Sequence, residues 1–177
     1  MNLFKKLFLV VLLASITSSV GIAREEHEES RREGDTEISG LVMNTAYAKE
    51  CGACHLAYQP QLLPKRSWIK IMDTLDNHFG ENASLDEAVR TQILSYVVGN
   101  SAEVGRSEAS RKILSSINDT DTPLRISDTA YFKRKHRKIQ PDVFRRKSIL
   151  SPSNCAGCHP AAQKGDFDEH GVKIPKN

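Results

Sequence analysis

One five-residue pattern, present twice, constrains this chain more than any other feature. The copies are Cys51-Gly52-Ala53-Cys54-His55 and Cys155-Ala156-Gly157-Cys158-His159, and together they contain all four cysteines of the 177 residues. Cysteines three apart on a helical turn project to one side, so both thiols can bond the two vinyl groups of one porphyrin. The histidine that follows can then reach the iron, and the whole pattern is the signature of covalent haem c attachment. Two haem c groups are therefore expected, with covalent links from Cys51, Cys54, Cys155 and Cys158 and proximal iron ligands His55 and His159.

Three other uses of paired cysteines fit the sequence less well. Zinc sites combine two such pairs, but these pairs are far apart in the chain and a histidine directly follows each. A redox-active pair is typical of a βαβ context, and no segment has the alternation of a strand. A disulfide between cysteines three apart closes too short a loop to stabilise a fold strongly.

The sixth iron ligands decide what the haems can do, and the sequence offers few candidates. Methionine would raise the reduction potential, and beyond the first 23 residues only Met43 and Met72 occur, with Met72 expected in the core. His78 ends the apolar stripe of a predicted helix, and His136 lies among aromatic and basic residues between the two motifs.

We therefore expect His78 and His136 to be the distal ligands of two low-spin, low-potential haems. A packed core histidine at 78 and a solvated one at 136 are the alternatives. His170 and His27 lie in polar segments and are weaker candidates. Which distal histidine serves which haem stays open.

The first 44 residues are expected to lie outside the haem-binding fold. Residues 1–23 combine two lysines, the apolar run LFLVVLLA and a small-residue site at 21–23, as in a cleaved signal peptide. The apolar run is shorter than the roughly 20 residues that span a bilayer, although an uncleaved anchor is the alternative. Residues 24–44 are acidic and nearly free of apolar side chains in their first part, which predicts a disordered leader. A periplasmic protein, not membrane-spanning after cleavage, is expected.

The remaining chain reads as mainly α, with much irregular structure wrapped around two haems. Helices are predicted over 45–54, over 68–79 with Ser67 as N-cap, over 84–99 with a Ser84–Glu87 capping box, and over 106–117. The polar loop 119–123 divides a first haem lobe, 45–118, from a second, 119–177.

A basic stretch, 133–147, precedes the second motif. Its side chains could form a solvated face, could balance the charge of haem propionates, or could form a surface that steers an acidic redox partner. Nucleic acid is not an expected partner in the periplasm.

Beyond the motifs, several segments resemble the bacterial dihaem cytochrome c family known as DHC. The matching segments are ECGACHLAYQPQLLP at 50–64, Arg66-Ser67-Trp68, HFGENASL at 78–85, Lys135-His136-Arg137, SNCAGCHP at 153–160, Gly165-Asp166-Phe167 and Ile174-Pro175. The resemblance implies a mostly helical fold and bis-histidine ligation, with His78 and His136 in family-like positions. It also implies redox protein partners, such as a small oxygen-binding haem protein and a membrane b-type cytochrome.

Two irons with strong ligands on both sides leave no position for a substrate, so an electron carrier that is not an enzyme is expected. Three alternatives remain. They are the dihaem subunit of a larger periplasmic reductase, a dihaem peroxidase, and a gas-binding or sensor protein with one open iron.

Overall fold

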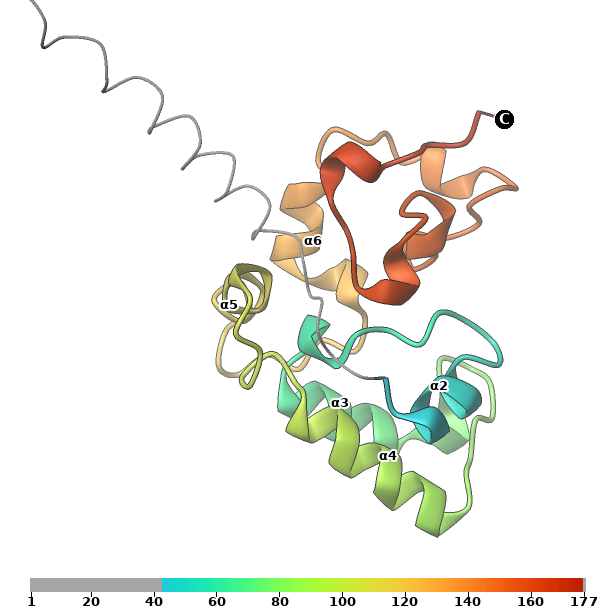
Figure 1. Cartoon of the computed structure of the whole chain (residues 1–177), viewed down its shortest axis with the longest axis vertical. Coiled ribbons are helices and arrows are strands. Elements are labelled where there is room, and N and C mark those ends of the chain that lie inside the picture. Colours follow the sequence, from blue (N-terminus) through green and yellow to red (C-terminus); the bar gives the residue numbers. More distant parts are fainter. Residues whose placement is uncertain (1–42, 177) are drawn as a thin grey trace, which may run out of the picture. The chain divides into compact units, whose positions relative to one another are not determined.

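Five α-helices and a series of 3-10 turns carry the fold of residues 43–176, which are the part of the chain that the computed structural model describes (Figure 1). The predicted signal peptide, His27 and the leader up to residue 42 lie outside this part. The helices are α2 (Thr45–Cys51), α3 (Lys65–Asp73), α4 (Glu87–Gly99), α5 (Glu108–Leu114) and α6 (Ala130–Lys135). The described residues contain no strand, as the sequence predicts.

The helix that leads into the first motif is α2. Asn44 begins it, because its side-chain oxygen accepts a hydrogen bond from the Tyr47 N–H at 3.0 Å. The helix ends at Cys51 with Gly52 as its C-cap, three residues before the predicted end at Cys54. The first cysteine of the motif is therefore helical and the second lies in the turn that follows.

The next helix, α3, begins earlier than predicted. Pro64 is its N-cap, and the exposed first N–H, of Lys65, donates to both carboxylate oxygens of Glu103 at 3.0 and 2.8 Å. The prediction of Ser67 as N-cap is wrong, since Ser67 lies inside the helix and is fully buried. The helix also ends early, at Asp73, because Thr74 leaves helical geometry with φ −126°. The predicted helix 68–79 is thus split, and its last part is the 3-10 turn η3 (Leu75–Asn77).

The longest helix, α4, ends at Gly99 with Asn100 as C-cap, as predicted, but its start differs. Asp86 is the N-cap and the Ser84–Glu87 capping box does not form. The Ser84 N–H instead binds the side chain of Asn82 at 2.9 Å. The Glu87 carboxylate pairs with Arg90.

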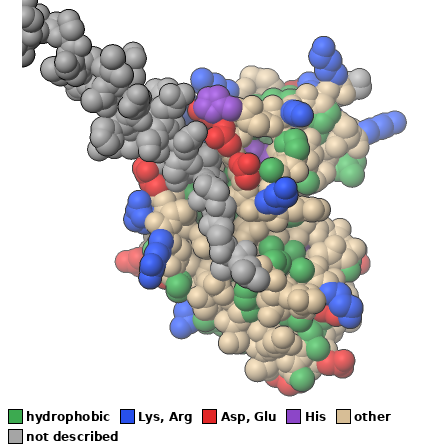
Figure 2. Space-filling model, in the orientation of Figure 1, with side chains coloured by type: hydrophobic (Ala, Val, Ile, Leu, Met, Phe, Trp, Pro, Cys, Tyr) green, Lys and Arg blue, Asp and Glu red, His purple; other side chains and the backbone are tan. Residues whose placement is uncertain are grey.

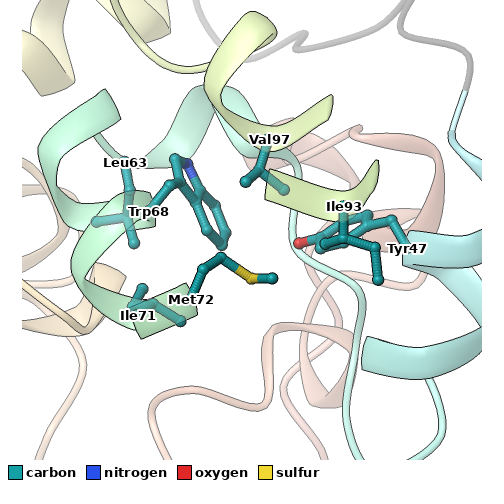
Figure 3. Packing of buried hydrophobic residues seen from close by; sticks show 7 residues of the cluster. All are labelled: Tyr47, Leu63, Trp68, Ile71, Met72, Ile93 and Val97. Carbon is teal, nitrogen blue, oxygen red and sulfur yellow. The ribbon is translucent and has the colours of Figure 1, made fainter. Parts of the chain in front are cut away.

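The main core lies where α3 and α4 lie side by side and α2 closes one end (Figures 1 and 3). The Trp68 indole N–H donates to the Pro60 carbonyl at 2.7 Å, which satisfies the one polar atom of that buried ring. Met72 is 3% exposed in this cluster, so the expectation that it packs in the core is confirmed. The buried members are Tyr47, Leu63, Trp68, Ile71, Met72, Ile93 and Val97.

A second cluster joins α5 to the later part of the chain. Ile113 on α5 packs with Leu62, and Tyr131 and Phe167 lie against the cluster from residues far along the sequence. Ser107 caps α5 by accepting from the Ser110 N–H, so this helix is shorter than the predicted 106–117.

From residue 115 onward, α6 is the one α-helix among the described residues, and the rest is turns and irregular chain. The loop 119–123 lies outside any helix, as predicted, while the division into two haem lobes stays a prediction. No helix within residues 43–176 is both long and apolar enough to cross a membrane.

Candidate haem sites

The first motif begins in the last turn of α2 and places His55 just beyond it. The His55 Nδ1 atom lies 2.7 Å from the carbonyl oxygen of Leu56. That contact favours the tautomer with the proton on Nδ1, which leaves the Nε2 lone pair free to bind a metal ion. His55 is exposed on its other side.

A tight turn brings His78 opposite His55. The two rings are nearly parallel, with centroids 6.1 Å apart and planes at 23°. The turn is closed by two backbone hydrogen bonds between His78 and Glu81, at 2.7 and 3.2 Å. Its central residues, Phe79 and Gly80, both have positive φ (57° and 100°), as a type I′ turn requires. Glycine adopts that backbone freely, whereas phenylalanine does so at an energetic cost that the surrounding contacts must offset.

A cavity of about 400 Å³ lies beside this turn, with His78 and Phe79 in its wall. Arg125, from the chain after α5, also lines it and sits 3.9 Å above the Phe79 ring. Burial, the neighbouring His55 and Arg125 together lower the pKa of His78. The imidazole is therefore neutral at neutral pH, the form that binds iron.

The second motif forms a single 3-10 turn, η6 (Cys155–Gly157). The Cys155 carbonyl accepts from the N–H groups of Cys158 and His159, at 3.2 and 2.8 Å. The turn brings the backbone of His159 directly over that of the first cysteine. The His159 Nδ1 atom is buried without a hydrogen-bond partner among the described residues.

His136 is the residue that faces His159, and it does so from the C-terminal end of α6. The two ring centroids are 6.2 Å apart, but the planes are steeply inclined, at 76°. Phe132 holds the His136 ring in two ways: the rings stack at 3.9 Å, and the Phe132 carbonyl lies 2.9 Å from His136 Nδ1. Burial lowers the pKa of His136 and of His159, so both rings are neutral.

The spacing of both histidine pairs fits one metal ion between two imidazoles. An imidazole nitrogen lies about 2 Å from a bound metal ion and about 1 Å from its ring centroid, so two opposed ligands have centroids about 6 Å apart. The observed 6.1 and 6.2 Å agree with this spacing. The sequence left the pairing open, and the geometry brings His55 to His78 and His159 to His136.

Cys51 and Cys155 are unlike reactive or zinc-binding thiols. Burial raises the pKa of Cys51 and of Cys155 to about 11, with Glu50 adding to the effect at Cys51. Redox-active cysteines instead have lowered pKa values. Within residues 43–176, no three His, Cys, Asp or Glu side chains gather as a metal site. Thioether attachment, which needs no thiolate in the folded protein, suits these positions.

The other candidate ligands are not brought to either pair. His170 is exposed, with its ring against Asp168 at 2.9 Å. Met72 is buried in the core, and Met43 accepts a hydrogen bond from the Tyr96 hydroxyl at 3.7 Å.

Tyr58 joins the two sites and was missed in the sequence. Its ring stacks on His55 with centroids 5.1 Å apart, and its hydroxyl donates to the Ser153 carbonyl at 2.8 Å. The same carbonyl accepts from the Cys155 N–H at 3.0 Å. An aromatic residue three positions after the first motif was the available signal, but its distant partner is not visible in the sequence.

Comparison with known proteins agrees with this arrangement. The dihaem cytochrome c family matches residues 47–167. A diheme cytochrome c from Rhodobacter sphaeroides is 48% identical, with a TM-score of 0.64, over 72% of this chain and 98% of that one. The diheme cytochrome c from Shewanella baltica OS155 is 38% identical, with a TM-score of 0.62, over 76% of this chain and 95% of that one.

A second structure, a crystal structure of DHC purified from Rhodobacter sphaeroides, is 44% identical, with a TM-score of 0.57, over 72% of this chain and all of that one. No curated protein matches the chain. The predicted family and the predicted helical fold with much irregular structure are both confirmed. The family implies two haem c groups and electron transfer with redox partners. The chain belongs to the dihaem cytochrome c family.

Proposed function

We propose that this chain is an exported electron carrier whose two haems are each held by two histidines. One haem would be bound through Cys51 and Cys54, and the other through Cys155 and Cys158. The iron ligands would be His55 with His78 at the first site and His159 with His136 at the second. The observation that carries the proposal is the pair of ring separations, 6.1 and 6.2 Å, each suited to one iron between two imidazoles.

Saturated ligation favours a carrier over an enzyme or a sensor. A bound haem supplies a one-electron couple, and its potential is set by axial ligand, burial and hydrogen bonding. The carbonyl contacts of His55 and His136 favour the proton on Nδ1 and leave the Nε2 lone pair of each ring free for iron. Two imidazoles give a lower potential than histidine with methionine. The two methionines of the described residues are engaged elsewhere, Met72 in the core and Met43 with the Tyr96 hydroxyl.

Export and partners follow from the sequence. The predicted signal peptide at 1–23 supports a periplasmic location. The family resemblance supports a small oxygen-binding haem protein and a membrane b-type cytochrome as redox partners.

The test is the absorption spectrum of the reduced holoprotein, recorded before and after carbon monoxide is added. Two bis-histidine sites predict identical spectra, because neither iron has a free position. A carbon monoxide shift at one haem would show an open iron and would favour a sensor or an enzyme.

A further inference from the structure

The chain around His136 carries a concentrated positive charge. Residues 133–147 contain eight Lys and Arg side chains and a single acid, Asp142. Seven of the eight basic residues are exposed, and Lys and Arg side chains stand out singly from the surface in Figure 2. We call these seven the basic face: Lys133, Arg134, Lys135, Arg137, Lys138, Arg145 and Lys147.

The basic face has no internal counter-charge. Within residues 43–176, no ion pair joins any of its seven side chains to a carboxylate. Arg134 lies over the Tyr131 ring at 5.5 Å, and Arg137 donates to the Arg134 carbonyl at 3.0 Å. Neither partner is a carboxylate, so these contacts do not neutralise the positive charge of the two side chains. Like charges crowded on a surface repel one another, and an anionic surface that approaches them relieves this repulsion.

One arginine of the stretch, Arg146, is placed differently from the seven residues of the basic face. Arg146 is half-buried, donates to the Pro175 carbonyl at 2.7 Å and has a buried Nε with no partner among the described residues. It also lies close enough to Cys158 to act on that thiol electrostatically. Arg146 thus points toward the second motif, while the basic face points to solvent.

The basic face lies in the chain on both sides of His136, whose ring is half-buried. Phe132, the residue just before the stretch, stacks on that ring, and Phe144, within the stretch, lies 6.2 Å from it. The charge is therefore gathered in the segment that supplies one member of the His136–His159 pair.

The chain around the other distal histidine has the opposite charge. Residues 71–89, which include His78, contain five exposed acids and no Lys or Arg. Asp73 and Glu87 share Arg90, and Arg125 is the cation nearest the His78 turn. An acidic protein would be attracted to the His136 side and repelled from the His78 side.

We propose that the basic face is the docking surface for an acidic redox protein, which exchanges electrons at the His136–His159 site. The proposal rests on the electron-carrier function above. One electron passes between the partner and the iron of that site, one being oxidised as the other is reduced, and no bond is made or broken.

The test uses the full holoprotein and flavodoxin, a small acidic FMN protein, as the probe. The variant combines Lys133→Gln, Lys138→Gln and Lys147→Gln, three exposed side chains without hydrogen bonds among the described residues. The matched control combines Lys65→Gln, Lys70→Gln and Arg106→Gln, three exposed side chains without ion pairs among the described residues, which removes the same charge outside the basic face. Calorimetry measures binding of oxidised flavodoxin, and stopped-flow absorbance measures reduction by its hydroquinone, both at low and high ionic strength.

The expected result is that the basic-face variant binds more weakly and is reduced about tenfold or more slowly than the wild type at low ionic strength, with little remaining salt dependence. The control should behave like the wild type, and both haem potentials should stay unchanged in both variants. Equal slowing of the two variants would mean that net charge alone matters, and would overturn the proposal.

Two other outcomes would overturn it as well. A changed haem potential without changed binding would mean that the seven cations balance propionates. Absence of salt-dependent binding by the wild type would mean that the face is not free for an acidic partner, as when the chain's own acidic leader covers it. The carbon monoxide spectrum decides the carrier function separately from all these results.

Discussion

Replacing Phe132 with leucine should loosen the orientation of the His136 ring while leaving its hydrogen bond in place. The Phe132 side chain stacks on the ring at 3.9 Å and 20°, whereas the Nδ1 contact is made to the Phe132 backbone and survives the change. An aromatic stack of this kind is worth about 0.5 to 1.5 kcal/mol beyond its burial. That energy favours the observed orientation by about two- to tenfold over others.

Electron paramagnetic resonance of the oxidised protein can read this orientation. Two parallel imidazole planes interact with the same one of the two iron d orbitals that have π symmetry toward the ligands, and so separate these two orbitals in energy. Two perpendicular planes interact with one of these orbitals each, so the two orbitals stay nearly equal in energy. The inclined rings of the second site, at 76°, therefore predict a more anisotropic low-spin signal than the rings of the first site, at 23°. In Phe132→Leu the more anisotropic signal should broaden and shift, and the other should not change.

A reciprocal variant provides the control. The Phe79 ring contacts His78 at 4.8 Å and lies at the first site, so Phe79→Leu should alter only the less anisotropic signal. Two identical wild-type signals, or a Phe132→Leu spectrum identical to the wild type, would refute the assignment of ring orientation.

Three further predictions concern stability. Glu103→Ala should lower the free energy of unfolding by about 1 kcal/mol, because the first N–H of α3, on Lys65, loses its acceptor; an unchanged denaturant midpoint would contradict this. Trp68→Phe should cost about 1 kcal/mol for its lost hydrogen bond to Pro60, plus lost packing, as circular dichroism melts would measure. Burial lowers the pKa of His136, so its contribution to stability is complete above its ordinary pKa near 6.5 and is lost as pH falls toward the lowered value. Denaturant curves from neutral to acidic pH should show falling stability, and a rise would refute the reasoning.

Local signals in the sequence predicted some element ends well and others badly. The end of α4 follows from Gly99 and Asn100, whose preference for helix ends is intrinsic. The start of α3 does not follow from its neighbours, because the first N–H, on Lys65, is satisfied by Glu103, a residue 38 positions later. Serine is a common N-cap residue, yet Ser67 lies inside α3 and is fully buried.

The candidate site, too, was predictable only where its pattern is local in the sequence. The two motifs are local in sequence, so the proposed haem-binding cysteines and proximal histidines can be predicted from spacing alone. The sequence predicts His78 at the end of the apolar stripe of a helix. That helix ends before Thr74, and a type I′ turn brings the His78 ring opposite His55. The pairing of distal with proximal histidines, and the link through Tyr58, depend on contacts between distant segments. No local pattern encodes such contacts.

The most direct test of the ligand assignment counts carbon monoxide molecules bound by reduced holoprotein variants. We expect none for the wild type, one each for His78→Ala and His136→Ala, two for the double variant, and none for His170→Ala, whose ring lies against Asp168. Carbon monoxide binding to the wild type or to His170→Ala would contradict the ligand assignment. A His78→Ala or His136→Ala variant that kept both haems and still bound no carbon monoxide would contradict it as well.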